Sequence, residues 1–176
     1  MLWHVNVVCW QGWGDKSYSR NNTITGNNIH HVLCGGPAGL AHAEQLVDGG
    51  ALYSLGAQPG STRSYNYLHQ CRPFGMLYHD SASAGFDDHH NVMADSPGMW
   101  WLLINSGRNL SVHHNYYDAS CNHSQVQGAC VPNTTVGTTC QRLNLSAHIH
   151  DNVFVPTAAG FPAEAKQIML AAGPTL

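Results

Sequence analysis

Apolar and polar positions repeat along the middle of the chain with a step of 25 residues. Three strand-like segments line up without gaps: Leu52-Tyr53-Ser54-Leu55, Leu77-Tyr78-His79-Asp80 and Leu102-Leu103-Ile104-Asn105. A fixed period in this range is typical of solenoids, in which each repeat forms one coil stacked on the next. The repeats are short and punctuated by Gly, Asn and Ser, so we predict strands in each coil. Leu52, Leu77 and Leu102 should then form one inward-facing column.

A second column of Asn residues shares this period. Each Asn precedes an apolar position, in Asn66-Tyr67-Leu68, Asn91-Val92-Met93 and Asn115-Tyr116-Tyr117, and the triplet recurs as Asn6-Val7-Val8, Asn27-Asn28-Ile29 and Asn152-Val153-Phe154. Asn tolerates positive φ better than most residues, so we place it at the turn between sheets. Stacked Asn side chains can also hydrogen-bond along the axis. The alternative is that Asn-rich loops merely recur in an Asn-rich chain.

These patterns predict an all-β fold, a single parallel β-helix domain over residues 1–176. Two segments interrupt the period and are interpreted as insertions, about 34–47 and 119–140. Phe161 to Gly173 carries helix start and stop signals, and its apolar residues (Ala165, Ile168, Met169 and Ala172) are expected to cap the last coil. The first rung begins in the middle of a coil, so we expect further coils upstream.

Composition narrows the function classes. Charged residues make up only 10% of the chain, and seven Lys and Arg with a net charge of −3 argue against nucleic-acid binding. There is no apolar run long enough for a membrane span. Five glycosylation sequons (Asn21, Asn109, Asn122, Asn133 and Asn144) and six cysteines predict a secreted glycoprotein with disulfides. A cytosolic protein with buried thiols and accidental sequons is the alternative.

The candidate chemistry lies in a few carboxylates beside the regular strands. Asp80 ends its segment and, by the 25-residue register, stacks between Leu55 and Asn105. Glycoside hydrolysis needs two carboxyl groups about 5–5.5 Å or about 6.5–9.5 Å apart. We therefore take Asp80, Asp48 and Asp87 as candidate catalytic residues. An Asp beside Gly is also a common turn residue.

Histidine and aromatic residues supply further candidates. Two residues before the rung Asn positions stand His4, Thr25, Ser64, His89, His113 and His150, which strand alternation should turn outward as a ladder. A metal site needs several ligands to converge, so we assign no metal ligands. An aromatic ring can cover the apolar face of a sugar. Tyr53, Tyr78 and Trp101 are therefore candidate substrate-binding residues, together with His79 beside Asp80.

Three motifs resemble a known group of proteins. Asp48 to Gly60 resembles the "DGGAIYTLG-QPG" stretch of right-handed parallel β-helix proteins of the pectate-lyase-like superfamily. Gly75 to Ser81 is similar to their "GLY-DEGS" stretch, and Phe161 to Gly173 to their "PAEAQAI-AAG" helix. The resemblance is to β-helix glycoside hydrolases that act on fucosides and xylans, and it implies such an activity without a cofactor.

One position departs from this pattern, because Ser81 stands where the family usually has Glu. If that Glu is the general acid, hydrolysis is impaired, and a non-catalytic glycan-binding protein is the alternative. A polysaccharide lyase is a third possibility. It would need Ca²⁺ held by Asp87 and Asp88, with Arg63 as the base.

Overall fold

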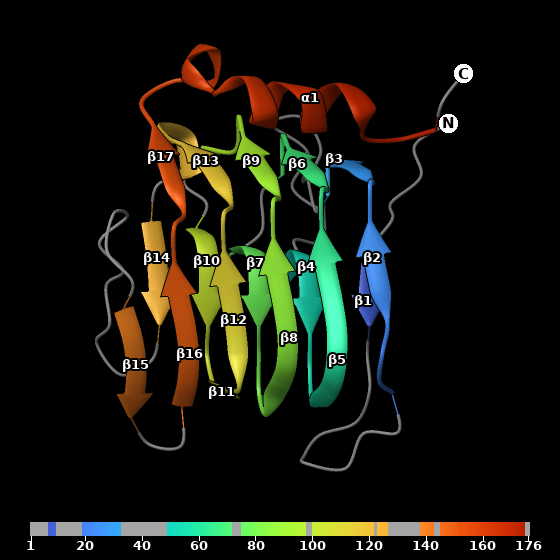
Figure 1. The fold of residues 1–176 in the computed structure, drawn as a ribbon, viewed down its shortest axis with the longest axis vertical. Coiled ribbons are helices and arrows are strands. Elements are labelled where there is room, and N and C mark those ends of the chain that lie inside the picture. The colour runs from blue at the N-terminus through green and yellow to red at the C-terminus, as the bar shows by residue number, and fades with distance from the viewer. Residues whose placement is uncertain are drawn as a thin grey trace, which may run out of the picture.

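The computed structural model describes residues 7–9, 19–32, 49–71, 75–97, 100–121, 123–126, 138–142 and 145–174 of the 176-residue chain. These residues are mostly β-strand, in three sheets dominated by parallel pairing, with one short α-helix near the C-terminal end (Figure 1). The predicted strand-rich repeats are confirmed at this level.

We call the sheets A, B and C. Sheet A has the spatial order β1 (Val7–Cys9), β4 (Gly50–Ser54), β7 (Gly75–His79), β10 (Trp100–Ile104) and β14 (His123–Val126). Sheet B has the order β15 (Thr138–Arg142), β16 (Leu145–His150), β12 (Leu110–His113), β8 (Ser83–His89), β5 (Ala57–Ser64) and β2 (Thr23–Thr25), and β11 (Gly107–Arg108) also pairs with β8. Sheet C has the order β17 (Val153–Val155), β13 (Tyr116–Asp118), β9 (Val92–Ala94), β6 (Tyr67–His69) and β3 (Asn28–His30).

The chain visits the sheets in a cyclic order. It passes from β4 in sheet A to β5 in sheet B and β6 in sheet C, and then returns to sheet A at β7. In the regular coils, a strand pairs in parallel with the strand one repeat later, as β4 does with β7 and β7 with β10. This topology is compatible with the predicted parallel β-helix.

The Leu column occupies the interior, as predicted. Leu52 pairs with Leu77 and Leu77 with Leu102, and all three are fully buried. They belong to one hydrophobic core built from all three sheets. Burying a Leu side chain contributes about 1.5–3 kcal/mol, so this column is a main source of cohesion between coils.

The Asn column forms the predicted ladder. Amide groups hydrogen-bond from Asn27 to Asn66, Asn66 to Asn91, Asn91 to Asn115 and Asn115 to Asn152, each with an Nδ2···Oδ1 distance of 2.9 Å. The predicted role at positive φ is wrong, however. The residue before each ladder Asn has positive φ instead: Gly26, Tyr65, His90, His114 and Asp151. Asn is needed here for its amide, which satisfies neighbouring backbone groups as well as the next Asn.

The first rung needs a correction. The sequence places Asn6-Val7-Val8 in the Asn column, which would put it in sheet C. In the structure, Val7 pairs with Leu52 and Val8 with Tyr53, so this segment is a strand of sheet A. A short apolar stretch suits either sheet, and the backbone pairing with β4 places this one in sheet A.

The predicted insertions have different outcomes. The segment 34–47 lies outside the described residues. The segment 119–140 is partly regular, because it begins with a 3₁₀ turn (Ala119–Cys121) and β14 then pairs with β10 in sheet A. Strand β15 runs antiparallel to β16 at the edge of sheet B. A further strand of sheet A is therefore present where the sequence indicated only a loop.

The C-terminal helix α1 (Ala163–Ala171) follows a second 3₁₀ turn (Ala158–Gly160) and does not cap the last coil. It lies across sheet C, over strands of several coils (Figure 1). Beyond its end, the Gly173 amide donates to the Gly26 carbonyl oxygen at 2.8 Å, beside strand β2. Nine residues of helix span about 13.5 Å, which matches about three strand spacings.

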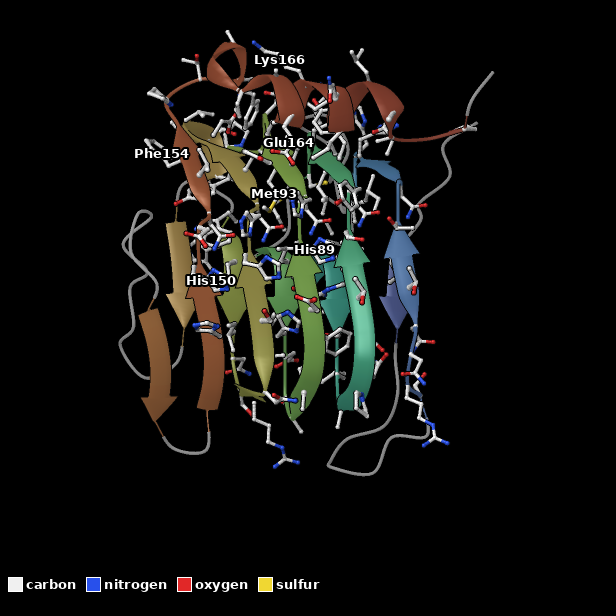
Figure 2. All side chains as sticks on the ribbon, viewed as in Figure 1. His89, Met93, His150, Phe154, Glu164 and Lys166 are labelled. Atoms are coloured by element: carbon white, nitrogen blue, oxygen red, sulfur yellow. The ribbon has the colours of Figure 1, made fainter. Side chains whose placement is uncertain are left out.

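Apolar residues on the outer face of sheet C explain this position. Ala165 and Ile168 of α1 pack with Phe161 in a second hydrophobic cluster, whose sheet residues are Val92, Ala94, Tyr116 and Val155. At one side, the Tyr116 hydroxyl donates to Glu164 at 2.6 Å. Figure 2 shows Glu164 reaching from α1 toward sheet C. The helix therefore covers an apolar sheet face that would otherwise meet water.

Candidate functional site

Asp80 lies where the chain leaves strand β7, and the predicted register holds around it. The Asp80 amide donates to the Ser54 carbonyl oxygen, and the Asn105 amide donates to the His79 carbonyl oxygen. Three side chains then converge on the carboxylate: the Tyr53 hydroxyl at 2.6 Å, Asn105 Nδ2 at 2.7 Å and the Ser81 hydroxyl at 3.3 Å. We call Tyr53, Asp80, Ser81 and Asn105 the Asp80 cluster.

The environment keeps Asp80 ionised. Burial by itself would raise the pKa of this carboxyl, but hydrogen bonds from Asn105, Tyr53 and Ser81 outweigh it and lower the pKa below its usual value. Each of these donors stabilises the charged form. A carboxyl with a lowered pKa is deprotonated at neutral pH, so it suits a base, a nucleophile or an anchoring group. It does not suit a general acid.

The two predicted substrate-binding tyrosines lie together beside this cluster. Tyr53 and Tyr78 are paired on neighbouring strands, with ring centroids 5.0 Å apart in an edge-to-face arrangement. Because side chains alternate along a strand, both rings lie on the face of sheet A opposite the Leu column. Tyr53 is partly exposed, whereas Tyr78 is buried. Tyr53 is therefore the aromatic residue of this pair that a ligand can reach.

Of the other two catalytic candidates, only Asp87 lies in the described residues, and it has no contact with Asp80 there. Asp87 lies on strand β8, where its carboxylate accepts from His113 Nε2 at 3.0 Å. Ser83, whose amide bonds to the Asp80 carbonyl, precedes Asp87 by four residues, and four residues of strand span about 13 Å. The two carboxylates also have different partners, since Asp80 accepts from Tyr53 and Asn105 whereas Asp87 contacts His113. Asp48 lies outside the described residues.

Two predicted sugar-binding residues are in the interior. Trp101 is 2% exposed and stacks on Tyr117, with ring centroids 4.5 Å apart. His79 is completely buried, because it shares the inward face of sheet A with Leu77. Neither side chain is on a surface that a glycan could contact. Alternation along β7 therefore separates His79 from Tyr78 and Asp80, its neighbours in sequence.

His79 belongs instead to a buried charged cluster with Arg63 and Asp88. Arg63 Nε donates to Asp88 Oδ1 at 2.7 Å, the Arg63 Nη2 group contacts the other carboxylate oxygen, and His79 Nε2 lies 2.7 Å from the same oxygen. Arg63 and His79 hold the pKa of Asp88 well below its usual range, although burial acts in the opposite direction. Burial, followed by the charge of Arg63, lowers the pKa of His79 and keeps its imidazole neutral.

A serine completes a contact sequence that resembles a catalytic triad. The Ser54 hydroxyl lies 3.1 Å from His79 Nδ1, on the side of the ring away from Asp88. Nucleophilic catalysis requires that a substrate reach the serine oxygen. Ser54 is 1% exposed, and His79 and Asp88 are fully buried, so no substrate can approach in this conformation. The cluster therefore has a structural role, linking sheets A and B through the core.

The same geometry gives no support to a lyase. That activity would need an accessible Arg63 beside two exposed carboxylates. Arg63 is buried against Asp88 and over the Phe86 ring, and Asp87 lies on the opposite face of β8 from Asp88. The 25-residue step from Arg63 to Asp88 is visible in the sequence. The sequence does not indicate that their side chains meet inside the core.

The predicted outward ladder is confirmed on sheet B for five of its six members, and His4 lies outside the described residues. Thr25, Ser64, His89, His113 and His150 occupy one column of paired positions. The imidazoles of His89, His113 and His150 stack in nearly parallel planes, with centroids 5.3 and 5.1 Å apart. Figure 2 shows His89 and His150 on the face of sheet B toward the viewer.

Only some of the sequons and cysteines that predict secretion lie in the described residues. The sequon residues Asn21 and Asn109 are exposed, and the other three sequons lie outside the described residues. Cys71 and Cys121 are buried thiols, so the predicted disulfides do not form at these two positions. The side chains of the other four cysteines lie outside the described part of the chain.

In the described residues, no helix is both long and apolar enough to cross a membrane. Comparison with known proteins finds no matching family model, no similar curated protein and no similar solved structure. The function must therefore be inferred from the chain's own residues.

Proposed function

We propose that this chain is a secreted, right-handed parallel β-helix that binds a polysaccharide or glycan at the Asp80 cluster. The observation that carries the proposal is the convergence of Tyr53 and Asn105 on Asp80 across neighbouring coils. Tyr53 comes from the first resembling motif and Asp80 from the second. Exposed sequons at Asn21 and Asn109 support passage through the secretory route.

The cluster suits an uncharged, hydroxyl-rich ligand. The Tyr53 ring offers an apolar surface for the C–H face of a sugar, and its hydroxyl is oriented by Asp80 at 2.6 Å. Asn105 adds an amide that is partly exposed and fixed at 2.7 Å from the same carboxylate. Asp80 is itself 5% exposed, so its role in binding is to position these two residues. Such preorganisation reduces the entropy cost of binding.

A glycoside hydrolase is the second candidate, favoured by the lowered pKa of Asp80 and by the resemblance of Gly75 to Ser81 to β-helix glycoside hydrolases. An ionised Asp80 can serve as base or nucleophile, but hydrolysis also needs a carboxylic acid to protonate the leaving oxygen. The Ser81 hydroxyl stands 3.3 Å from Asp80 where the resembling proteins usually have Glu. A hydroxyl group cannot replace that acid, so the wild-type chain should hydrolyse slowly and Ser81→Glu should be faster.

Binding and turnover should be measured separately on one panel of plant and algal polysaccharides and aryl glycosides. Tyr53→Phe keeps the ring but removes the oriented hydroxyl, and should weaken glycan binding by about three- to tenfold, the value of one hydrogen bond. Tyr65→Phe is the matched control, because Tyr65 is exposed on another face and stacks on His90. If Tyr53→Phe, Tyr65→Phe and wild type bind the glycan with equal affinity, the Asp80 cluster is not the binding site.

Turnover then decides between the two candidates. Release of aryl alcohol by Ser81→Glu, with little by wild type, would support the hydrolase. Retained binding without turnover by either protein would leave only glycan binding. If the protein neither binds nor hydrolyses any member of the panel, the proposal as a whole is overturned.

A further inference from the structure

Two columns of side chains run side by side where sheet B turns toward sheet C. The first column contains His89, His113 and His150, and the second contains His90, His114 and Asp151. We call these six residues the histidine grid. The second column stacks like the first, with the His90 and His114 rings 5.3 Å apart and nearly parallel. Sequence periodicity indicated the first column but not how the second lies against it.

The backbone of the turn brings the two columns together. His90, His114 and Asp151 have φ values of 54°, 52° and 52°, the left-handed conformation that non-Gly residues seldom adopt. This conformation directs each side chain toward that of the preceding residue. His89 and His90 approach with Nδ1 atoms 2.9 Å apart, and His113 and His114 with Nδ1 atoms 2.8 Å apart.

The last rung replaces the second imidazole with a carboxylate. His150 Nδ1 lies 2.7 Å from Asp151 Oδ2, so this pair offers one nitrogen and one charged oxygen. His114, from the previous coil, lies beside them. One donor atom each from His114, His150 and Asp151 all fall within 4.8 Å of one another. In the described residues, no other group of His, Cys, Asp or Glu meets this criterion.

These separations are close to those of a metal coordination sphere. With metal–nitrogen distances of 2.0–2.1 Å, two ligands lie about 2.9 Å apart at a right angle and about 3.4 Å apart in a tetrahedron. The His150–Asp151 pair is already near this range, and His114 has to close a gap of less than about 2 Å. His114 and Asp151 are exposed, so their side chains can rotate without disturbing the core.

We propose that His114, His150 and Asp151 bind a divalent transition-metal ion, with water completing its coordination. Two imidazole nitrogens and one carboxylate are a set that Zn²⁺ accepts, whereas Ca²⁺ and Mg²⁺ favour all-oxygen sites. The carboxylate explains why this rung is preferred over the His89–His90 and His113–His114 pairs. It supplies the negative charge that offsets the ion. This site lies where sheet B turns toward sheet C and is independent of glycan binding at the Asp80 cluster.

The test uses the chain without a polyhistidine tag, stripped with a chelator, and titrated with Co²⁺ and Zn²⁺. We expect one Co²⁺ per chain in calorimetry, with a visible absorption band that Zn²⁺ displaces. His114→Asn and Asp151→Asn should each weaken binding by more than about tenfold. Asn is chosen because it tolerates the positive φ of both positions.

His90→Asn is the matched control, because it makes the same change at the same turn position one coil earlier. It should change Co²⁺ affinity by less than about twofold if the ion binds at the last rung. Equal weakening by His90→Asn and His114→Asn would overturn the site, as would the absence of one-to-one binding by wild type. If His114→Asn does not fold, as judged by circular dichroism, then Asp151→Asn decides, because its side chain is exposed at the surface.

Discussion

The Tyr53 hydroxyl donates a 2.6 Å hydrogen bond to Asp80 Oδ2 across neighbouring strands of sheet A. The two residues are 27 positions apart, one coil plus two residues, and so lie close only when the coils stack in the observed register. This contact connects the stability of the stack to the candidate binding site. It also explains why Asp80 remains ionised while nearly buried.

The first prediction concerns the pH dependence of Asp80. Because its pKa in the folded state is lowered below the ordinary value of about 3.9, it stabilises the fold above that pH. The contribution is lost as pH falls through the folded pKa. Asp80→Asn should lower the free energy of unfolding by about 1–3 kcal/mol at pH 7 and by less at pH 3. Urea unfolding across this range measures the difference.

Asp95→Asn is the control for this experiment, because Asp95 is exposed and Asn suits its positive φ. It should change the unfolding free energy by less than about 0.5 kcal/mol at either pH. A wild-type advantage over Asp80→Asn that grows on acidification would contradict the assigned ionisation.

The second prediction tests the Leu column. Leu77→Ala leaves a cavity between Leu52 and Leu102 and should cost about 2–5 kcal/mol. Leu170→Ala removes the same atoms from a residue that is 88% exposed, and should cost less than about 0.5 kcal/mol. Chemical denaturation of both variants gives the comparison. Similar losses in the two would mean that Leu77 is not in the interior.

The third prediction concerns the buried Arg63–Asp88 pair. Asp88→Asn leaves the Arg63 guanidinium buried without its counter-charge, and should lower stability by about 3–5 kcal/mol. Asp87→Asn, at the next residue, disturbs only a surface pair with His113 and should cost about 0–1 kcal/mol.

A double variant, Arg63→Met with Asp88→Leu, measures how the two residues depend on each other. It removes both charges. It should cost less stability than the sum of the losses measured for Arg63→Met alone and Asp88→Leu alone. Strict additivity in this cycle would show that the two side chains are not coupled.

The fourth prediction tests the packing of α1 on sheet C. Ile168→Asp places a charge in the apolar cluster beneath the helix and should detach α1, exposing Val92, Ala94 and Tyr116. Binding of the dye ANS should then increase severalfold. Leu170→Asp, on the exposed side of the same helix, should leave dye binding unchanged. If the two variants bind ANS equally, α1 does not pack on sheet C through Ile168.

The sequence period was enough to predict positions within a coil. The 25-residue step pairs Leu52 with Leu77, stacks Asp80 below Asn105 and aligns His89 with the other ladder residues. A regular repeat constrains these relationships because each coil must match its neighbours at the strand spacing. The Asn-x-apolar triplet does not by itself indicate which sheet a short segment joins, so its prediction for Asn6-Val7-Val8 is wrong, because Val7–Cys9 pairs in sheet A.

What the sequence determined by itself is the composition of each column, including the Asn ladder, the interior leucines and the outward histidines. Only the tertiary structure decided how the columns face one another across the interior and at the corners. It brought Arg63 and Asp88 of sheet B to His79 of sheet A, and Tyr53 to Asp80. It also laid α1 along sheet C instead of over the last coil. The physical reason is that periodicity describes neighbours along the axis, whereas contacts between sheets depend on turn conformation and on which apolar faces remain to be covered.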